Sequence, residues 1–248
     1  MTYHFIIRGY NCAPYIKECL NSILAQTHRD WVATVCLDAP TDNSYEKAIK
    51  FTKDRRIKVY RNRKRLGVAG NLIETIQLAA PSNDDVLVIV DADDRIIPRA
   101  LEIVNNEYCK NKYLQLTYGS YWRMNFKRRT KTSKPYKNNK SVRKQSCHGS
   151  HLKTVKYSLF KHIPIDYFKK IEKGTDNVVW FNAASDIALV LPLWDLIGVD
   201  RYKTHTKWIK KPIYIYRGKT FPKIRGSDQF KNKKLIYKKK PLERLEVL

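Results

Sequence analysis

The run Val86-Leu87-Val88-Ile89-Val90-Asp91-Ala92-Asp93-Asp94 decides the fold class of this chain. Five consecutive apolar residues, most of them β-branched, predict a strand buried on both faces, as in a parallel sheet covered by helices. Three carboxylates follow at the carboxyl end of this strand. They repel one another and lose hydration unless a cation or hydrogen-bond donors share their site.

The residues on either side of this run alternate between strand and helix periods. The expected strands are Phe5–Ile7, Val32–Leu37, Ile57–Tyr60 and Leu114–Tyr118, and the expected helical faces are 16–24, 45–49, 72–80 and 98–104. This alternation predicts an α/β fold with a largely parallel sheet flanked by helices, in which ligands bind beyond the carboxyl ends of the strands. Later residues are less regular. We expect a solvated basic loop over 127–144, a helix from Asp186 toward Ile197 and a final strand at 212–216.

Positive charge is distributed unevenly along the 248 residues, which carry 49 Lys and Arg, 23 Asp and Glu, and a net charge of +26. The first 100 residues are almost balanced, with 15 basic and 12 acidic side chains, whereas the other 148 hold 34 and 11. Nucleic acid, an anionic membrane surface, an acidic polymer and an anionic small substrate are all compatible with this excess. We therefore expect the two halves to have different roles.

Five scattered cysteines without a C-x-x-C pair indicate reduced thiols in a cytoplasmic protein rather than a disulfide framework or a zinc site. The chain begins directly with a strand-like run, so no signal peptide is expected. Its longest apolar stretch, 178–194, is interrupted by polar residues and Pro192, so no transmembrane helix is expected. The predicted protein is soluble or peripherally associated with a membrane.

Asp91 and Asp93 have the spacing at which two carboxylates can face one hard divalent cation. The alternative is a polar turn in which Asp93 or Asp94 caps the next helix. Asp38 ends another predicted strand, and its alternative is also a helix cap, a role that Asp42 would serve as well. Two neighbouring strand ends that carry acids would fit a nucleotide held through its base and its diphosphate.

Five segments within residues 4–100 carry a further signal. They are Ile6-Ile7-Arg8-Gly9-Tyr10-Asn11, Cys19-Leu20-Asn21-Ser22-Ile23-Leu24-Ala25-Gln26-Thr27, Leu37-Asp38-Ala39-Pro40-Thr41-Asp42, Leu66-Gly67-Val68-Ala69-Gly70-Asn71 and Val90-Asp91-Ala92-Asp93-Asp94. In this order and spacing they resemble the family 2 glycosyltransferases, which have the GT-A fold. The chain departs from the family at Arg8, where Pro is usual, and at Leu37, which replaces the first acid of a common Asp-Asp pair.

The resemblance implies roles for individual positions. The residues implied to bind the nucleotide-sugar are Arg8, Tyr10, Asp38, Gly67, Asn71, Asp91, Ala92 and His151. Among them, Arg8 would add a phosphate contact and Asp38 would receive the N–H of a uracil-like base. Manganese or magnesium would be bound by Asp93 and Asp91, with Asp93 favoured as the direct ligand.

The second half resembles the family more weakly, in the segments Ser150–Thr154 and Asp186–Pro192. The family usually has a Glu-Asp pair where this chain has Ser185-Asp186. We take Asp186 as the general base that deprotonates the acceptor, the alternative being a cap of the helix that it opens. His151, like His148, would touch the diphosphate or complete the ligands of the metal, and its alternative is a hydrogen-bonded structural histidine.

The expected protein is one GT-A domain, with a nucleotide-sugar-binding half at 1–118, an acceptor and catalytic half at 119–217 and a basic tail at 218–248. It would be a metal-dependent, inverting glycosyltransferase that uses a nucleotide-diphosphate sugar, UDP-linked in our reading, and a hydroxyl of a glycan or glycoconjugate. One rival is a nucleic-acid-binding protein, suggested by Lys127-Arg128-Arg129 near Tyr121 and Trp122, but no recognised motif supports it. The other is a sugar nucleotidyltransferase, for which Arg8-Gly9 is a poor phosphate loop.

Overall fold

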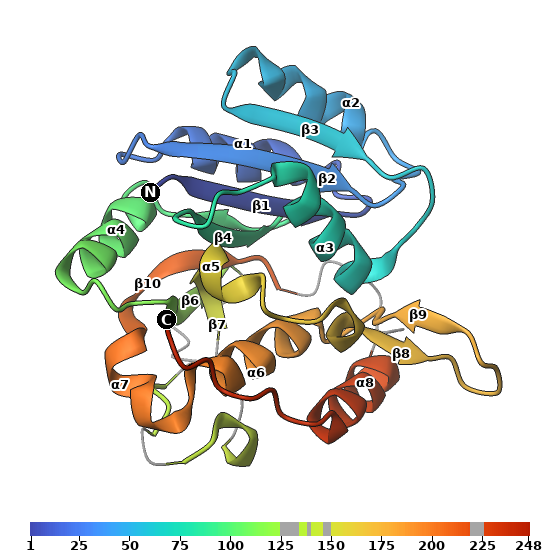
Figure 1. Ribbon diagram of the computed structural model, residues 1–248. Coiled ribbons are helices and arrows are strands. Elements are labelled where there is room, and N and C mark those ends of the chain that lie inside the picture. The colour runs from blue at the N-terminus through green and yellow to red at the C-terminus, as the bar shows by residue number, and fades with distance from the viewer. Residues whose placement is uncertain (125–133, 138–139, 146–149, 219–225) are drawn as a thin grey trace.

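A computed structural model describes residues 1–124, 134–137, 140–145, 150–218 and 226–248. One eight-stranded sheet runs through the centre in the order β3-β2-β1-β4-β7-β6-β10-β5, with helices on both of its faces (Figure 1). This is the mixed α/β architecture that the alternating sequence periods predict.

The strands of the first hundred residues follow the expected pattern. They are β1 (Tyr3–Gly9), β2 (Trp31–Leu37), β3 (Ile57–Arg61) and β4 (Val86–Asp91), and they are connected through α1 (Ile16–Leu24), α2 (Ser44–Ala48), the 3₁₀ turn η1 (Ile49–Lys53) and α3 (Gly67–Ala79). All four strands are parallel, and β1 lies between β2 and β4, so that Arg8 is opposite both Cys36 and Asp91. The predicted strands and connecting helices are therefore confirmed, with α3 beginning earlier than expected, at Gly67.

The second half completes the sheet with mixed directions. Its elements are β5 (Arg95–Ile96), α4 (Ala100–Lys110), β6 (Leu116–Arg123), β7 (Ser150–Lys156) and β10 (Thr206–Tyr216). β7 is antiparallel to both β4 and β6, whereas β10 is parallel to β6. β7 was not predicted, because its apolar residues Leu152 and Val155 are three positions apart, so that they lie on opposite faces and give no alternating pattern.

The remaining elements come from the second half of the chain. They are η2 (Val142–Lys144), α5 (Tyr157–Phe160), η3 (Ile165–Phe168), β8 (Lys169–Ile171), β9 (Val178–Trp180), α6 (Ser185–Ile197), η4 (Val199–Arg201), α7 (Tyr202–His205) and α8 (Gly226–Lys238). The apolar stretch 178–194 is divided between β9 and α6. Within the described ranges, no helix has the length and apolar character needed to cross a membrane.

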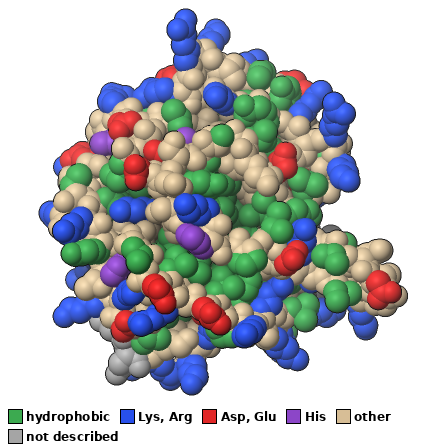
Figure 2. All heavy atoms as spheres, viewed as in Figure 1, with side chains coloured by type: hydrophobic (Ala, Val, Ile, Leu, Met, Phe, Trp, Pro, Cys, Tyr) green, Lys and Arg blue, Asp and Glu red, His purple; other side chains and the backbone are tan. Residues whose placement is uncertain are grey.

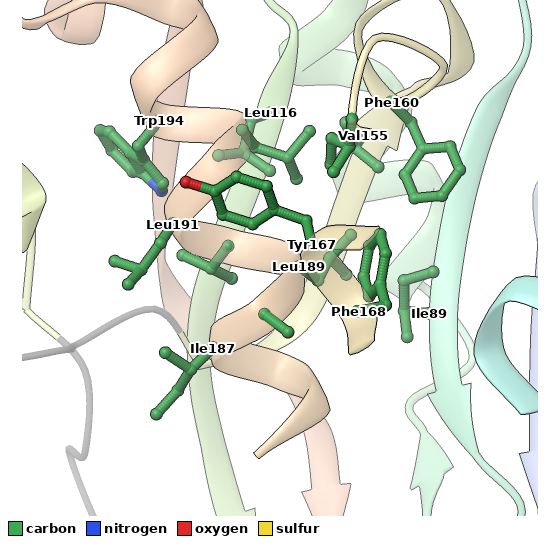
Figure 3. Packing of buried hydrophobic residues seen from close by; sticks show 14 of the residues in the cluster. Ile89, Leu116, Val155, Phe160, Tyr167, Phe168, Ile187, Leu189, Leu191 and Trp194 are labelled. Atoms are coloured by element: carbon green, nitrogen blue, oxygen red, sulfur yellow. The ribbon is translucent and has the colours of Figure 1, made fainter. Parts of the chain in front are cut away.

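The two faces of β4 pack against different sets of helices. Leu87 and Ile89 belong to the hydrophobic cluster that includes α3 and α6, and the three valines of the strand belong to the cluster that includes α1 and α4. Figure 3 shows Ile89 beside Phe168 on the side of the sheet that α6 covers. The strand that decided the fold class is thus buried on both faces, as predicted.

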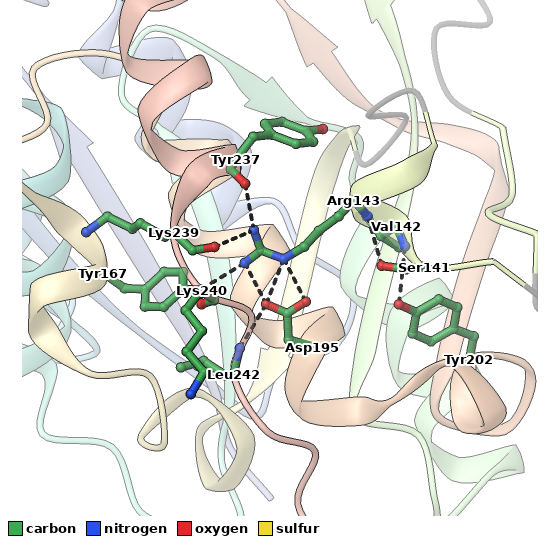
Figure 4. Close-up of polar contacts among 10 residues, drawn as sticks. All are labelled: Ser141, Val142, Arg143, Tyr167, Asp195, Tyr202, Tyr237, Lys239, Lys240 and Leu242. Atoms are coloured by element: carbon green, nitrogen blue, oxygen red, sulfur yellow. Dashed lines mark hydrogen bonds and ion pairs between the residues drawn. The ribbon is translucent and has the colours of Figure 1, made fainter.

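The segment after α8 runs back over α6 and is held there by hydrogen bonds. Arg143 and Asp195 of α6 form an ion pair of 2.7 Å whose side chains are only 10% and 7% exposed. Arg143 also donates to the carbonyl oxygens of Tyr237 and Lys239, at 3.3 and 3.2 Å (Figure 4). The carbonyl of Leu196 likewise accepts the N–H of Leu245 at 2.9 Å. The C-terminal segment is therefore part of the packing of α6.

The prediction of a solvated loop over 127–144 holds only in part for the residues that the structure describes, because the exposed lysines alternate with buried side chains. Tyr136 and Val142 are 4% and 1% exposed, and Arg143 makes the buried ion pair with Asp195. Basic composition alone misled here, because an arginine with a carboxylate partner can be buried. Residues 125–133 and 138–139 of this stretch lie outside the described residues.

On the face seen in Figure 2, the Lys and Arg side chains are spread widely and interspersed with acids.

Candidate active site

The turn after β4 gives its carboxylates different environments. Asp94 is 1% exposed and accepts hydrogen bonds from the Tyr214 hydroxyl (2.7 Å) and from the backbone N–H of Arg217 (2.8 Å). Burial, reinforced by the negative charges of Asp93 and Asp91, raises the pKa of Asp94 to about 8. Asp94 is therefore a structural member of the turn and does not cap α4, which begins only at Ala100. The other two carboxylates are left at the strand end.

Arg217, at the end of β10, holds this turn in position. Its Nε–H donates to the carbonyl oxygen of Asp93 at 2.8 Å, and its Nη2 pairs with Glu18 at 2.6 Å. The guanidinium also lies 4.3 Å from the ring centre of Tyr15. The sequence interpretation missed Arg217, since 124 residues separate it from Asp93 and its only signal is its place directly after the last expected strand.

Arg8 joins three elements with one guanidinium group. Its Nη2 lies 3.1 Å from the carboxylate of Asp91, and its Nη1 donates to the carbonyl of Val68 (2.9 Å) and to the hydroxyl of Ser185 (2.8 Å). Burial opposes ionisation of Asp91, but the charge of Arg8 and of neighbouring cations holds its pKa below the usual value. The end of β4, the first turn of α3 and the first turn of α6 therefore meet at Arg8, whose two Nη groups are occupied by the protein itself.

Asp186 lies in the first turn of α6, next to the serine that Arg8 contacts. The helix starts at Ser185, and the capping position before it is Ala184, which has a left-handed backbone (φ +62°) and provides no side-chain cap. The capping alternative for Asp186 is therefore wrong. The carboxylate is half-buried and lies where the positive end of the helix dipole favours a negative charge.

Asp38 organises the turn that leads into α3. It is 3% exposed and accepts hydrogen bonds from the Asn62 amide (3.0 Å) and from the backbone N–H groups of Leu66 (2.8 Å) and Gly67 (2.9 Å). The carboxylate therefore caps α3 from across the strand end. The helix that directly follows Asp38 uses Asp42 instead, which accepts the Ser44 N–H at 3.0 Å.

The other residues that were predicted to contact the nucleotide differ in their exposure to solvent. Asn71 is 3% exposed and donates to the carbonyl of Cys36 (3.0 Å), and Ala92 is 1% exposed, beside Gly9. Tyr10 is only half-buried, and the Arg65 guanidinium lies 3.2 Å from its ring centre. Tyr10 and Arg65 thus form an accessible part of the carboxyl end of the sheet, while Asn71 and Ala92 are buried behind it.

His151 lies near the start of β7, beside the aromatic rings of Tyr214 and Tyr216 on β10. Its ring stacks on Tyr214 with 4.5 Å between centres and 15° between planes. Burial, with the charge of Lys153 adding to it, lowers the pKa of His151 to about 3, so the imidazole is neutral at physiological pH. His148, the other candidate, lies outside the described residues.

The acid turn suits a divalent cation that is shared with a ligand. Among the described side chains, no group of three or more His, Cys, Asp and Glu is arranged to hold a metal. Asp91 and Asp93 provide two carboxylates, one of which is already paired with Arg8. Manganese and magnesium accept water and phosphate oxygens as further ligands. The residues therefore fit a cation bound together with a phosphate-bearing molecule.

Comparison with known sequences points to one family. The model described as glycosyl transferase family 2 matches residues 5–167. The chain is 31% identical over 116 residues to the Escherichia coli UDP-Glc:alpha-D-GlcNAc-diphosphoundecaprenol beta-1,3-glucosyltransferase WfgD, which covers 47% of this chain and 44% of that protein. It is 31% identical over 113 residues to the chondroitin synthase of Pasteurella multocida, covering 45% and 11%. The matching region thus spans less than half of either relative.

Solved structures extend the likeness to nearly the whole chain. Staphylococcus aureus TarS in complex with UDP-GlcNAc superposes with a TM-score of 0.68 at 16% identity, over 95% of this chain and 65% of that one. The mannosyltransferase PcManGT of Pyrobaculum calidifontis, in complex with GDP-Man and Mn²⁺, gives a TM-score of 0.59 at 16% identity, over 90% and 57%. The expected GT-A fold is therefore confirmed, including the irregular second half.

Proposed function

We propose that this chain, which belongs to glycosyl transferase family 2, moves a sugar from a nucleotide-diphosphate sugar to an acceptor hydroxyl with inversion at the anomeric carbon. The observation that carries the proposal is the double contact of Arg8 with Asp91 and Ser185. It supports a single site in which the acid turn receives the diphosphate of the donor and the first turn of α6 receives the acceptor. GT-A folds bind their ligands at the carboxyl ends of parallel strands, where these residues lie.

The donor that we favour is a UDP-sugar. The E. coli relative is named for UDP-Glc, and the TarS structure holds UDP-GlcNAc. Tyr10 would contact the nucleotide directly, because its ring is half-buried at the strand end. Asp38 would act through the 62–67 turn that it holds, since its carboxylate already accepts three hydrogen bonds. Gly67, Asn71 and Ala92 would border the ligand as parts of the enclosing backbone.

Asp186 would act as the general base. Its carboxylate takes the proton of the acceptor hydroxyl while the acceptor oxygen attacks the anomeric carbon from the face opposite the diphosphate. The bond between that carbon and the β-phosphate oxygen breaks, and its electron pair leaves with the nucleoside diphosphate. A single displacement of this kind inverts the configuration. Arg8 would keep Asp91 and the start of α6 in a fixed relation during this step.

Manganese or magnesium, held by Asp93 and Asp91 together with phosphate oxygens of the donor, would neutralise charge on the departing diphosphate. We favour Asp93 as the direct ligand because Asp91 is paired with Arg8. The Mn²⁺ in the PcManGT complex supports a divalent cation in this fold. His151, neutral and close to the turn, would border the diphosphate or the cation.

The acceptor that we propose is a hydroxyl of a glycan or glycoconjugate. The acceptor in the name of the E. coli relative is linked to a diphosphate lipid. The excess of 34 basic over 11 acidic side chains after residue 100 would favour an anionic acceptor or peripheral contact with an anionic membrane in the cytoplasm. In this proposal, 1–118 binds the donor and 119–217 the acceptor, and the described part of the tail, from 226 on, supports α6.

A thermal-shift screen of UDP-, GDP- and dTDP-sugars with MnCl₂ tests the proposal. We expect UDP-sugars to raise the Tm most, and EDTA to reduce the shift, because ligand binding stabilises the folded state by mass action. Release of UDP on addition of a diphosphate-linked glycan would then identify transfer. No shift with any nucleotide-sugar, together with steeply salt-dependent binding to single-stranded nucleic acid, would reject the proposal in favour of the nucleic-acid alternative.

A further inference from the structure

Lys153 is a buried lysine in the middle of the sheet. It lies on β7, between β4 and β6, and is 4% exposed. Lysine is almost never this deeply buried without a partner, because its ammonium group loses hydration. Within the part of the chain that the structure describes, Lys153 makes no ion pair and no side-chain hydrogen bond, yet its Nζ is not among the side-chain atoms that are fully buried without a partner. The stem of the side chain is therefore enclosed, while the ammonium group stays in contact with solvent, where a ligand can reach it.

The register of the sheet directs Lys153 toward the acid turn. Lys153 is opposite Ile89, and Asp91 is two residues farther along β4 on the same face. Val155, two residues from Lys153, packs in the cluster that includes α6, whereas Leu152 packs in the other cluster. Diagonal positions in a sheet are roughly 7–8 Å apart, which a lysine side chain can span. The side chain of Lys153 is therefore on the face of the sheet that α6 covers, within reach of the end of β4.

The charge of Lys153 is felt at this end of the sheet. It contributes to lowering the pKa of Asp91 and opposes protonation of His151. The negative charge of Asp91 does not by itself explain the positive charge of Lys153, because the Arg8 guanidinium already lies 3.1 Å from that carboxylate. Two cations thus act on one carboxylate, and the nearby His151 is neutral. Asp91 therefore has a second positive charge near it besides that of its ion-pair partner.

We propose that Lys153 binds the diphosphate of the donor and of the departing nucleoside diphosphate, as a protein cation that acts beside the metal. The proposal rests on the proposed function, because it needs a diphosphate ligand at the acid turn. In the displacement, the electron pair of the broken carbon–oxygen bond stays on the β-phosphate. The Lys153 ammonium would donate a hydrogen bond to a phosphate oxygen and would keep its proton throughout.

The test measures the binding of UDP, UMP and uridine by calorimetry in MnCl₂ to the wild-type chain and to Lys153→Met. Methionine fills a similar volume without charge, so folding should be retained and the Tm unchanged or higher. We expect UDP to bind about 10- to 100-fold more weakly, because a charge-assisted hydrogen bond is lost. UMP should lose less affinity, and uridine none. Lys153→Gln replaces the methionine variant if that variant does not melt cooperatively.

The matched control is Lys156→Met, at the other end of the same strand, where the side chain is half-exposed and opposite Val86. It should bind UDP like the wild type. The same Lys153→Met change in an Asp91→Asn background should still weaken UDP binding. If the effect vanishes in that background, or if uridine loses as much affinity as UDP, or if UDP binds unchanged, Lys153 does not bind the diphosphate. A wild-type chain that binds no nucleoside diphosphate would instead reject the proposed function itself.

Discussion

The first hundred residues and the later half build their parts of the site in different ways. In the first, Arg8 and Asp91 are at the ends of β1 and β4, and Asp38 directly follows β2, so parallel register alone aligns them. In the second, α6 is positioned by contacts between distant residues. Its Ser185 is bound by Arg8, 177 residues away, and its Asp195 by Arg143, 52 residues away. The carboxyl end of the sheet is thus specified locally, whereas the position of α6 depends on individual polar contacts.

Replacement of the proposed base should have the largest effect on activity. It should lower the rate of transfer without changing donor binding, and so distinguish the roles of the two halves. We expect Asp186→Asn to lower kcat by about 10²- to 10⁴-fold, because an amide cannot accept the proton of the acceptor hydroxyl. The affinity for UDP should stay within about threefold of wild type on this view, since the donor half is untouched. Transfer kinetics and calorimetry check the two statements. The control is Asp200→Asn, which changes an exposed carboxylate beyond the end of α6. A near-normal kcat for Asp186→Asn would mean that another residue is the base.

The next effect concerns the donor half. We expect Asp93→Asn to lower kcat/KM by about 10²- to 10³-fold, as is usual when one group that stabilises transition-state charge is removed. Binding of Mn²⁺ in the presence of UDP, followed by electron paramagnetic resonance, should weaken in parallel. Asp84→Asn, which changes an exposed carboxylate before β4, should leave both unchanged. Normal Mn²⁺ binding by Asp93→Asn would contradict the metal assignment.

The dependence of α6 on buried ion pairs can be tested through stability. Arg143→Ala should destabilise the protein by about 3–5 kcal/mol, because it leaves Asp195 buried without its charge partner. For a chain of this size the loss corresponds to a Tm decrease of roughly 6–20 °C. Arg244→Ala breaks a pair with Asp200 whose side chains are 57% and 59% exposed, and it should cost at most about 1 kcal/mol. Equal effects of the two substitutions in differential scanning calorimetry would contradict this interpretation.

The smallest effect should come from the residue that joins the halves. Lysine in place of Arg8 can pair with Asp91 but cannot also reach Val68 and Ser185, because it lacks the planar fork of arginine. We expect Arg8→Lys to lower kcat by about 10-fold, with the KM for the donor within about threefold, since the pair with Asp91 is kept while the link to the start of α6 is lost. Arg61→Lys, at the exposed end of β3, is the control. A change confined to KM would indicate that Arg8 binds the donor directly.

Much of the donor half could be predicted from sequence because its signals are local. The apolar run of β4 and the acids after it lie within nine residues, and a strand buried on both faces has few other interpretations. The separation of Asp94 from Asp91 and Asp93 could not be predicted. It depends on Tyr214 and Arg217, which reach the turn from β10.

The later half was harder because polar residues there are held by partners far away in sequence. β7 carries Lys153 and His151 in the middle of the sheet, so its composition resembles that of a loop. Arg143 belongs to a basic stretch, and only the buried carboxylate of Asp195 makes its burial possible. Asp186 was predicted as a site residue through its resemblance to a family segment, but the capping alternative was excluded only when Ala184 was found at the helix start.

By itself, the sequence determined the parallel core, the acids at the strand ends and the imbalance of charge between the halves, because hydrophobic periodicity and strand order act over short distances. Tertiary structure decided which acid is buried, how Arg8 links Asp91 to α6, and that Lys153 shares a face of the sheet with Asp91. Those outcomes depend on burial and on which charges meet across the sheet. Such properties arise only when strands separated by tens of residues pair.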